Sequence, residues 1–312
     1  MANIHSINSI AVANINSVNN VAYASLNLVN STTAPQTASF ADSFAVAKSL
    51  TTTTSQAVYI ADSDGHFNFT HNQAYTISFW VKAGWSSSLN TNIHLFASTT
   101  SGSTDASANM IRLYYNESNN RLYYEYRSAS NAKKSNFYVF HANSGNYAAA
   151  YAAAGLGTTY WSASNRGNVG NNDFTMITVT KGTSNNAAAS NAQVYWNATS
   201  LGTGFYASGT GQGTPSMSSV DRQIALGSNS WAYEKSGNSV ETQYNDLTIW
   251  NKKLSASEVS ELYNSGARMD ATTHSAAANL QMYYKLENNG NDSSGNSAPA
   301  FVVNGNSNFE SI

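Results

Sequence analysis

Acidic residues are the first candidates for chemistry, because two carboxylates can together cleave a glycosidic bond. Retaining glycoside hydrolases hold an acid and a nucleophile about 5 Å apart. On a strand, this takes alternate residues of one face, as in Glu-x-Asp-x-Glu. No such run occurs here: Glu241 and Asp246 stand five residues apart, and Glu258 and Glu261 fall in a predicted helix. We therefore predict that the protein is not an enzyme.

Two further acidic residues, Asp62 and Asp64, lie on either side of a serine and are followed by Gly65. Their oxygens suit calcium, a hard cation. In the alternative interpretation, a turn, the same side chains accept hydrogen bonds from backbone amides. Only two carboxylates are present and no distal Glu follows, so the turn is favoured. Calcium at Asp62 and Asp64 stays open, and no other cofactor is predicted.

Histidine and cysteine chemistry is not indicated. His66 and His71 stand five residues apart in a predicted loop, where we expect them on the surface. The chain has no cysteine, which excludes disulfides, thiolate metal sites and cysteine nucleophiles. It also lacks a phosphate-binding glycine loop and a nucleophile elbow. The six histidines, without metal-ligand spacing, are residues 5, 66, 71, 94, 141 and 274.

The segment 128–172 is rich in Tyr, Ala, Gly and Asn. Aromatic rings with polar neighbours suit sugar stacking, and they suit a protein interface equally well. Contact with another subunit is favoured over packing within the domain and over glycan contact, and all three stay open. The candidate ligand-binding or interface residues are Tyr138, Tyr147, Tyr151, Tyr160 and Trp161.

The elements that must position these residues are mostly strands. Residues 75–82 alternate strictly, with Tyr75, Ile77, Phe79 and Val81 on one face. Residues 111–115 and 122–126 flank a polar loop and predict a hairpin. Half-buried strands separated by Gly and Asn clusters favour a β-sandwich. Further strands are predicted at 174–180, 193–197, 222–226, 244–250 and 280–286.

One short helix is predicted near the C-terminus. Ser255 and Glu258 have the spacing of a capping box, in which the Ser hydroxyl accepts from a helix amide and the Glu side chain reaches back. Gly266 suits a C-terminal stop. The predicted buried stripe consists of Val259, Leu262 and Tyr263.

Residues 1–31 contain an 11-residue repeat with copies beginning at Ile4 and Ile15 and a truncated copy at Leu26. A helix with this period would form a right-handed coil. The Asn, Ser, Ile and Val content favours short extended pieces instead. Two or three repeats bury little alone, so we predict an assembly segment, followed by a linker at 32–40; the alternative is a loosely ordered tail. The predicted assembly residues are Ile4, Ile7, Ile10, Ile15, Val18 and Val21.

Composition disfavours two classes of partner. Charged residues make up 10% of the 312, against about a quarter in typical proteins, and the net charge is −2. Without a basic patch, we expect no nucleic-acid binding. We also expect no membrane insertion, because no apolar run approaches the roughly 20 residues that span a bilayer. Residues 1–31 lack Lys and Arg, so no signal peptide is expected.

Several motifs resemble concanavalin A-like, laminin-G-like jelly-roll domains. The sequence Thr-Ile-Ser-Phe-Trp-Val-Lys at 76–82 resembles the opening strand of that family. Residues 244–263 are similar to its closing strand and helix, and 173–182 with 193–202 resemble its paired middle strands, with Phe174 in place of a Trp. The resemblance covers about residues 55–305. It implies an all-β sandwich jelly roll in 41–312 with one short capped helix, beside the N-terminal repeat.

The sequence departs from this family in two places. Residues 280–287, with 292–296, resemble a motif that such domains usually carry at their start. Here they follow the helix and form either an added terminal strand or the beginning of a truncated second copy. Residues 128–172 exceed the family pattern and form an insertion. Asp246 matches an acidic position of the closing strand, where the resemblance implies a structural hydrogen bond.

The repeat Ile-x-Ser-Ile-Asn-x-Ile-Ala-x-Ala, joined to such a domain, resembles virion structural proteins of tailed bacteriophages. That resemblance implies a non-enzymatic decoration, fibre or tail component that displays a lectin-like domain and is attached by its N-terminal repeat. Its partners would be other virion proteins, copies of itself and host surface glycans. It would be located in the virion and released by lysis, without a signal peptide. The alternative is a carbohydrate-binding module of a bacterial surface or secreted protein.

Overall fold

The computed structural model of the chain describes residues 17–18, 21–22, 48–52, 58–62, 65–70, 72–83, 92–100, 109–116, 121–127, 133–139, 174–183, 192–201, 205–208, 222–227, 242–303 and 308–311. In the strands within 17–62, 133–139, 205–208 and 302–303, and at residues 83, 92, 93, 121, 126, 127, 308, 310 and 311, only the backbone is described. Two units divide the chain, Met1–Gln36 and Thr37–Ile312. The predicted boundaries at 31 and 40 stay predictions.

In the described part of the first unit, β1 (Ser17–Val18) pairs antiparallel with β2 (Val21–Ala22), and Val18 stands opposite Val21. Both residues were predicted to serve assembly. The other residues predicted for assembly lie outside the described residues and are Ile4, Ile7, Ile10 and Ile15.

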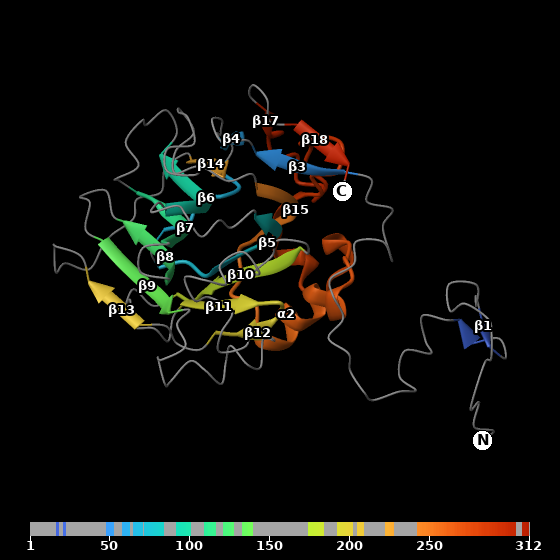
Figure 1. The fold of residues 1–312 in the computed structure, drawn as a ribbon, viewed down its shortest axis with the longest axis horizontal. Helices are drawn as coiled ribbons and strands as arrows, with labels where there is room; N and C mark the ends of the chain where they lie inside the picture. The colour runs from blue at the N-terminus through green and yellow to red at the C-terminus, as the bar shows by residue number, and fades with distance from the viewer. Residues whose placement is uncertain are drawn as a thin grey trace, which may run out of the picture. The chain divides into compact units, whose positions relative to one another are not determined.

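The second unit contains two antiparallel sheets (Figure 1). In the described residues, the first sheet has the order β12-β11-β10-β5-β15-β3-β18, with β16 paired to β15 beside this path. Its strands are β3 (Lys48–Thr52), β5 (Tyr75–Ala83), β10 (Thr175–Lys181), β11 (Ala192–Trp196), β12 (Thr199–Ser200), β15 (Thr242–Trp250), β16 (Leu280–Tyr284) and β18 (Asn308–Ser311).

The second sheet has the order β13-β9-β8-β7-β6-β14-β4-β17 in the described residues. The predicted hairpin is confirmed as β7 and β8, whereas β6 and β9 were not predicted. Residues 133–139 of the predicted insertion form β9. The strands of the second sheet are β4 (Val58–Asp62), β6 (Asn92–Thr100), β7 (Ile111–Asn116), β8 (Arg121–Arg127), β9 (Lys133–Val139), β13 (Phe205–Ser208), β14 (Arg222–Leu226) and β17 (Val302–Val303).

The two sheets pack face to face over one apolar core, which confirms the predicted β-sandwich. Tyr75, Ile77, Phe79 and Val81 of β5 all belong to this core, as their alternation predicted. Phe79 stacks on Phe96 of β6 with ring centroids 6.5 Å apart. The sheets are also joined by hydrogen bonds, since the Tyr244 hydroxyl donates to the Leu95 carbonyl at 3.0 Å.

The opposite face of the first sheet is buried as well. Trp80, Met176 and Trp250 pack there with Val259 and Leu262 of helix α2 (Ala256–Tyr263) in a second apolar cluster. Two polar residues of this face satisfy each other within the sheet: the hydroxyls of Ser78 and Thr178 lie 2.7 Å apart. The first sheet is therefore a central layer between the core and the helix.

Helix α2 confirms the capping box and corrects the predicted stop. The Ser255 hydroxyl accepts from the Glu258 amide at 3.3 Å, and the Glu258 carboxylate accepts from the Ser255 amide at 2.8 Å. The helix ends before Gly266, because Asn264 already takes the left-handed C-cap conformation with φ 48°. Asn tolerates this region through its short polar side chain. Tyr263 is half-buried and stacks on Trp80.

The C-terminal segment completes both sheets. β16 pairs with β15, β17 with β4, and β18 with β3, all antiparallel. Between β16 and β17, the Asp292 carboxylate accepts from the amides of Tyr283, Ser294 and Ala298. Residues 280–287 thus form an added terminal strand, the first of the two alternatives. Among the described residues, no helix has the length and apolarity needed to cross a membrane.

Candidate functional site

Of the predicted site residues, Tyr138 and Asp62 lie in strands of which only the backbone is described. Tyr138 stands opposite Leu122, a core residue, so its register position is on the inner face of the second sheet. Asp62 stands opposite Arg222, which is buried. The remaining candidates lie outside the described residues and are Asp64, Tyr147, Tyr151, Tyr160 and Trp161.

Side chains that could bind a ligand gather instead on the outer face of the second sheet. We call this group the outer-face cluster. It follows from the register, in which His94 stands opposite Tyr114, Tyr114 opposite Tyr123, and Arg112 opposite Glu125. Their neighbours in β7 and β8 point the other way, because successive side chains of a strand alternate between faces. Those neighbours in the core are Ile111, Leu113, Tyr115, Leu122 and Tyr124.

Tyr114 is the centre of the outer-face cluster. Its ring stacks on Tyr123 with centroids 4.9 Å apart and planes within 5°. The His94 ring lies 5.6 Å away on the other neighbouring strand. The Arg112 guanidinium carbon lies 4.3 Å from the centroid of the Tyr114 ring, a cation–π distance. These contacts fix a planar cation and aromatic rings against one another on three adjacent strands.

The charge of Arg112 is matched within the cluster. One of its terminal nitrogens lies 2.9 Å from the Glu125 carboxylate; 13% of the Arg112 side chain is exposed and none of Glu125. Burial, followed by the charge of Arg112, lowers the pKa of His94 from 6.5 to about 3. His94 is therefore neutral at physiological pH. Tyr123 is half-buried, so Tyr123 and Arg112 are the members that reach solvent.

A second polar group surrounds Asp246, which takes a left-handed conformation with φ 46° at an irregularity of β15. Its carboxylate accepts two hydrogen bonds from Arg268 and one, at 2.9 Å, from the Tyr283 hydroxyl. Arg268 also donates to Glu287. Burial opposes the charge of Arg268, but these acceptors outweigh it and raise the pKa of Arg268 above its usual range. The structural hydrogen bond implied for Asp246 is confirmed.

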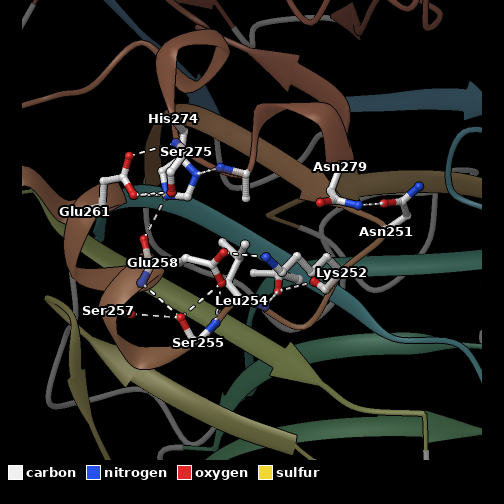
Figure 2. A network of polar contacts seen from close by, with 12 residues as sticks. Asn251, Lys252, Leu254, Ser255, Ser257, Glu258, Glu261, His274, Ser275 and Asn279 are labelled. Atoms are coloured by element: carbon white, nitrogen blue, oxygen red, sulfur yellow. Dashed lines mark hydrogen bonds and ion pairs between the residues drawn. The ribbon is translucent and has the colours of Figure 1, made fainter.

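A third polar network holds helix α2 and the turns that follow it (Figure 2). His274 accepts from the Ala276 amide through Nδ1 at 3.0 Å, so its Nε2 carries the proton that is donated to the Glu258 carbonyl at 2.9 Å. Glu261 accepts from both the amide and the hydroxyl of Ser275. Each contact caps a turn. The network is therefore structural, and the burial of His274 had no signal in the sequence.

The carboxylates whose side chains the structure describes are engaged in such contacts. Glu241, which the sequence analysis weighed together with Asp246 for hydrolysis, lies outside the described residues. The described residues also contain no group of three His, Asp or Glu side chains that could hold a metal ion. The engaged pairs are Glu125 with Arg112, Asp246 and Glu287 with Arg268, Glu258 with Lys252, Glu261 with Ser275, Asp270 with Lys285, and Asp292 with backbone amides.

Part of the outer-face cluster had a signal in the sequence. The predicted hairpin of 111–126 already places Arg112 opposite Glu125 once its register is known. His94 had no such signal, because a register shift between His94 and Phe96 interrupts the alternation of β6. His66, expected on the surface, is half-buried with its Nε2 3.0 Å from the Asn296 carbonyl, and His71 lies outside the described residues.

The comparison with family models found no match, and the comparison with curated proteins found none either. Among solved structures, the chain is similar to the binding domain of botulinum neurotoxin DC in complex with rat synaptotagmin II (14% identity, TM-score 0.41, covering 70% of this chain and 42% of that one). It is also similar to the botulinum neurotoxin serotype G binding domain (13%, TM-score 0.37, 69% and 46%). The binding domain of Paraclostridial Mosquitocidal Protein 1 gives 14%, TM-score 0.41, 70% and 47%. The chain thus spans less than half the length of these structures.

Proposed function

We propose that the β-sandwich is a lectin-like domain of the jelly-roll type that binds saccharides on the outer face of its second sheet without cleaving them. The observation that carries this proposal is the outer-face cluster. Tyr114 and Tyr123 are stacked there at 4.9 Å beside Arg112 and His94. Polar recognition sites combine aromatic surface with a few well-placed polar groups.

The rigidity of the cluster supports a binding role. Arg112 is held from two sides, by the carboxylate of Glu125 and by the ring of Tyr114. Such a side chain loses little rotamer freedom when a ligand arrives, and preorganisation of this kind strengthens binding. Tyr123 is only half-buried beside it, and a tyrosine side chain can offer both an apolar ring and a hydroxyl to a sugar.

The environment of the carboxylates supports a non-enzymatic role. Glu125, the acidic member of the cluster, is fully buried and is paired with Arg112. A general acid or nucleophile for glycoside cleavage needs a second carboxylate across the scissile bond. Two other described carboxylates, Asp246 and Glu258, are paired with Arg268 and Lys252. Both pairs lie in networks separate from the outer-face cluster.

The setting that we propose for this domain is the bacteriophage virion, with residues 1–31 as the attachment segment. Support comes from the 11-residue repeat, whose apolar positions bury little without a partner. Other virion proteins and copies of this chain would then be its partners, and lysis would release it. The alternative setting is a bacterial surface or secreted protein in which this domain is a carbohydrate-binding module, and the binding face would be the same. Purified particles of the source would contain the chain in the first case and lack it in the second.

Saccharide binding without cleavage is tested by incubating the full chain with bacterial surface polysaccharides and β-glucans. We expect saturable binding in calorimetric titrations and no reducing ends above buffer. Release of reducing ends that disappears in Glu241→Gln or Asp246→Asn would contradict the non-enzymatic part. Absence of binding to every saccharide, by a protein shown to be folded, would contradict the lectin-like part.

A further inference from the structure

We infer that Asn289 is a site of spontaneous chemical modification. Its side-chain amide is lost through a cyclic imide formed with Gly290, and the isoaspartyl product loosens the last segment of the sandwich. The site lies between β16 and β17 and shares no residue with the outer-face cluster. The modification would limit the lifetime of the folded domain, whatever ligand the domain binds.

The sequence of this turn, Asn-Asn-Gly-Asn at 288–291, places an asparagine directly before a glycine. In such a pair the backbone nitrogen of the glycine can attack Cγ of the asparagine, because glycine has no Cβ to block the approach. The Asn289 side chain is exposed, so its amide has room to turn toward the backbone. Asn288 and Asn291 are exposed as well, but neither of them precedes a glycine.

A hydrogen bond holds the Asn289 side chain over the peptide bond that would be attacked. Its Oδ1 accepts from the Asn291 amide at 2.9 Å, so the side chain folds back along residues 290 and 291. Asparagine commonly bonds to the backbone two residues on in this way. The same N–H would stabilise the negative charge that develops on Oδ1 during attack at Cγ, as preorganised backbone amides do in oxyanion holes.

The attacking nitrogen, that of Gly290, is held in place by the fold. Gly290 is buried, and its carbonyl accepts from the Phe301 amide at 2.8 Å. In the part of the chain that the structure describes, no group accepts a hydrogen bond from the Gly290 amide. Attack by this nitrogen therefore breaks no hydrogen bond among the described residues, and only the exposed side chain of Asn289 has to move.

The reaction is balanced and requires only water. A bond forms between the Gly290 nitrogen and Cγ of Asn289, and the bond between Cγ and Nδ2 breaks. The proton of the Gly290 nitrogen leaves with Nδ2 as ammonia. Water then opens the cyclic imide at either of its carbonyls. Opening at Cγ gives aspartate, whereas opening at the backbone carbonyl gives isoaspartate, in which the main chain runs through Cβ and Cγ and is longer by a methylene group.

A longer main chain at residue 289 would disturb a close contact of the residue that follows it. A Cβ built at Gly290 would lie 2.6 Å from the Phe301 Cβ, so the two backbones touch without room to spare. Phe301 is buried, and its ring lies edge-on to Tyr284 with centroids 4.7 Å apart. It leads directly into β17, which pairs with β4. Displacement of Gly290 should therefore loosen Phe301 and the strand that follows it.

The first test follows the folded full chain by peptide mapping during incubation at physiological temperature. Trypsin releases residues 286–312 as one peptide, and fragment spectra separate Asn289 from Asn304, the other asparagine of the chain that precedes a glycine. We expect more deamidation at Asn289 than at Asn288 or Asn291, which share its exposure. Equal conversion of these three residues would overturn the inference. So would an Asn289 that keeps its amide in the folded chain and loses it only in urea, because the fold would then protect the site.

A matched pair of variants tests the effect on the fold. Asn289→Gln keeps an amide but would have to close a larger ring, which forms far more slowly. The control is Asn288→Gln, at an exposed neighbour that precedes no glycine. After incubation, the wild type and Asn288→Gln should unfold at a lower urea concentration than when fresh, whereas the midpoint of Asn289→Gln should not shift. Equal shifts in the two variants would show that another residue is responsible and would overturn the inference.

A third variant, Asn289→Asp, separates the added charge from the longer main chain. It carries the charge of the aspartyl product on a normal backbone, so the fresh variant should have the urea midpoint of the fresh wild type. A fresh Asn289→Asp as unstable as the incubated wild type would assign the loss to charge and contradict the loosening of Phe301. An unchanged midpoint in a wild type shown to contain isoaspartate at residue 289 would contradict it as well.

Discussion

Arg112 and Glu125 stand opposite each other on β7 and β8, and their ion pair of 2.9 Å lies on the sheet face that points away from the core. Glu125 is nevertheless fully buried, and only 13% of the Arg112 side chain is exposed. Desolvation of two charges is unfavourable, so such a pair adds little net stability. Its main effect is to hold its neighbours in one arrangement. Here it fixes the guanidinium over Tyr114.

Loss of one partner from this pair should be strongly destabilising. We expect Glu125→Leu to lower the free energy of unfolding by about 3 kcal/mol, because it leaves the Arg112 charge without its carboxylate. The double variant Arg112→Met, Glu125→Leu should recover most of that loss. Urea denaturation of the wild type, both single variants and the double variant measures the coupling. Additive effects of the two single substitutions would contradict a direct interaction.

Acid should destabilise the domain through His94. Its pKa is lowered to about 3 in the native state, whereas an unfolded histidine titrates near 6.5. Between these values the unfolded state binds the extra proton, so stability falls as pH decreases, by about 1.4 kcal/mol per pH unit. Urea denaturation between these pH values should give a shallower pH dependence for His94→Phe than for the wild type. Identical slopes would show that His94 titrates normally.

Loss of one partner from the Asp246–Arg268 pair should destabilise the protein as much as loss of one partner from the Arg112–Glu125 pair. Asp246→Asn keeps a residue that tolerates the observed φ of 46° but removes the negative charge. We expect a loss of about 3 kcal/mol in unfolding free energy, because Arg268 would retain Glu287 as its only described carboxylate partner. Ser260→Ala, on the exposed side of α2, is the control and should change little. A loss below about 1 kcal/mol for Asp246→Asn would show that the network is dispensable.

The repeat should be separable from the sandwich. The contacts of the chain divide it after Gln36, and the apolar positions of 1–31 are too few for a core. A chain without residues 1–31 should remain soluble, unfold cooperatively and no longer join its assembly. Aggregation of the shortened chain would show that the repeat belongs to the core of the sandwich.

The sequence predicted those elements whose pattern is local. Strict alternation over 75–82 gave β5 and its core face, and the Ser255–Glu258 spacing gave the start of α2. The burial of Thr76 and Ser78 had no signal, because polar side chains normally mark the solvated face of a strand. They are buried because helix α2 and the second apolar cluster cover this face, and the hydroxyl of Ser78 bonds to Thr178 and that of Thr76 to the Lys252 carbonyl. Such partners lie far apart in the chain.

The candidate site was predictable to a smaller degree. Arg112 and Glu125 follow from the hairpin register, since Asn116 and Arg121 close its loop. The place of His94 depends on the register shift in β6. Non-local pairing of this kind leaves no periodic trace in the sequence.

The central claim, that the outer face of the second sheet binds saccharide, is tested most directly at Tyr123. Tyr123→Ala removes the ring that reaches solvent, and the lost stacking on Tyr114 should lower stability by only about 1 kcal/mol. The probe is the polysaccharide that the wild type binds in the saccharide titrations proposed above. We predict that calorimetric titration will show an affinity for it at least about tenfold weaker for Tyr123→Ala than for Ser260→Ala or the wild type. Unchanged affinity in a folded Tyr123→Ala protein would contradict the account.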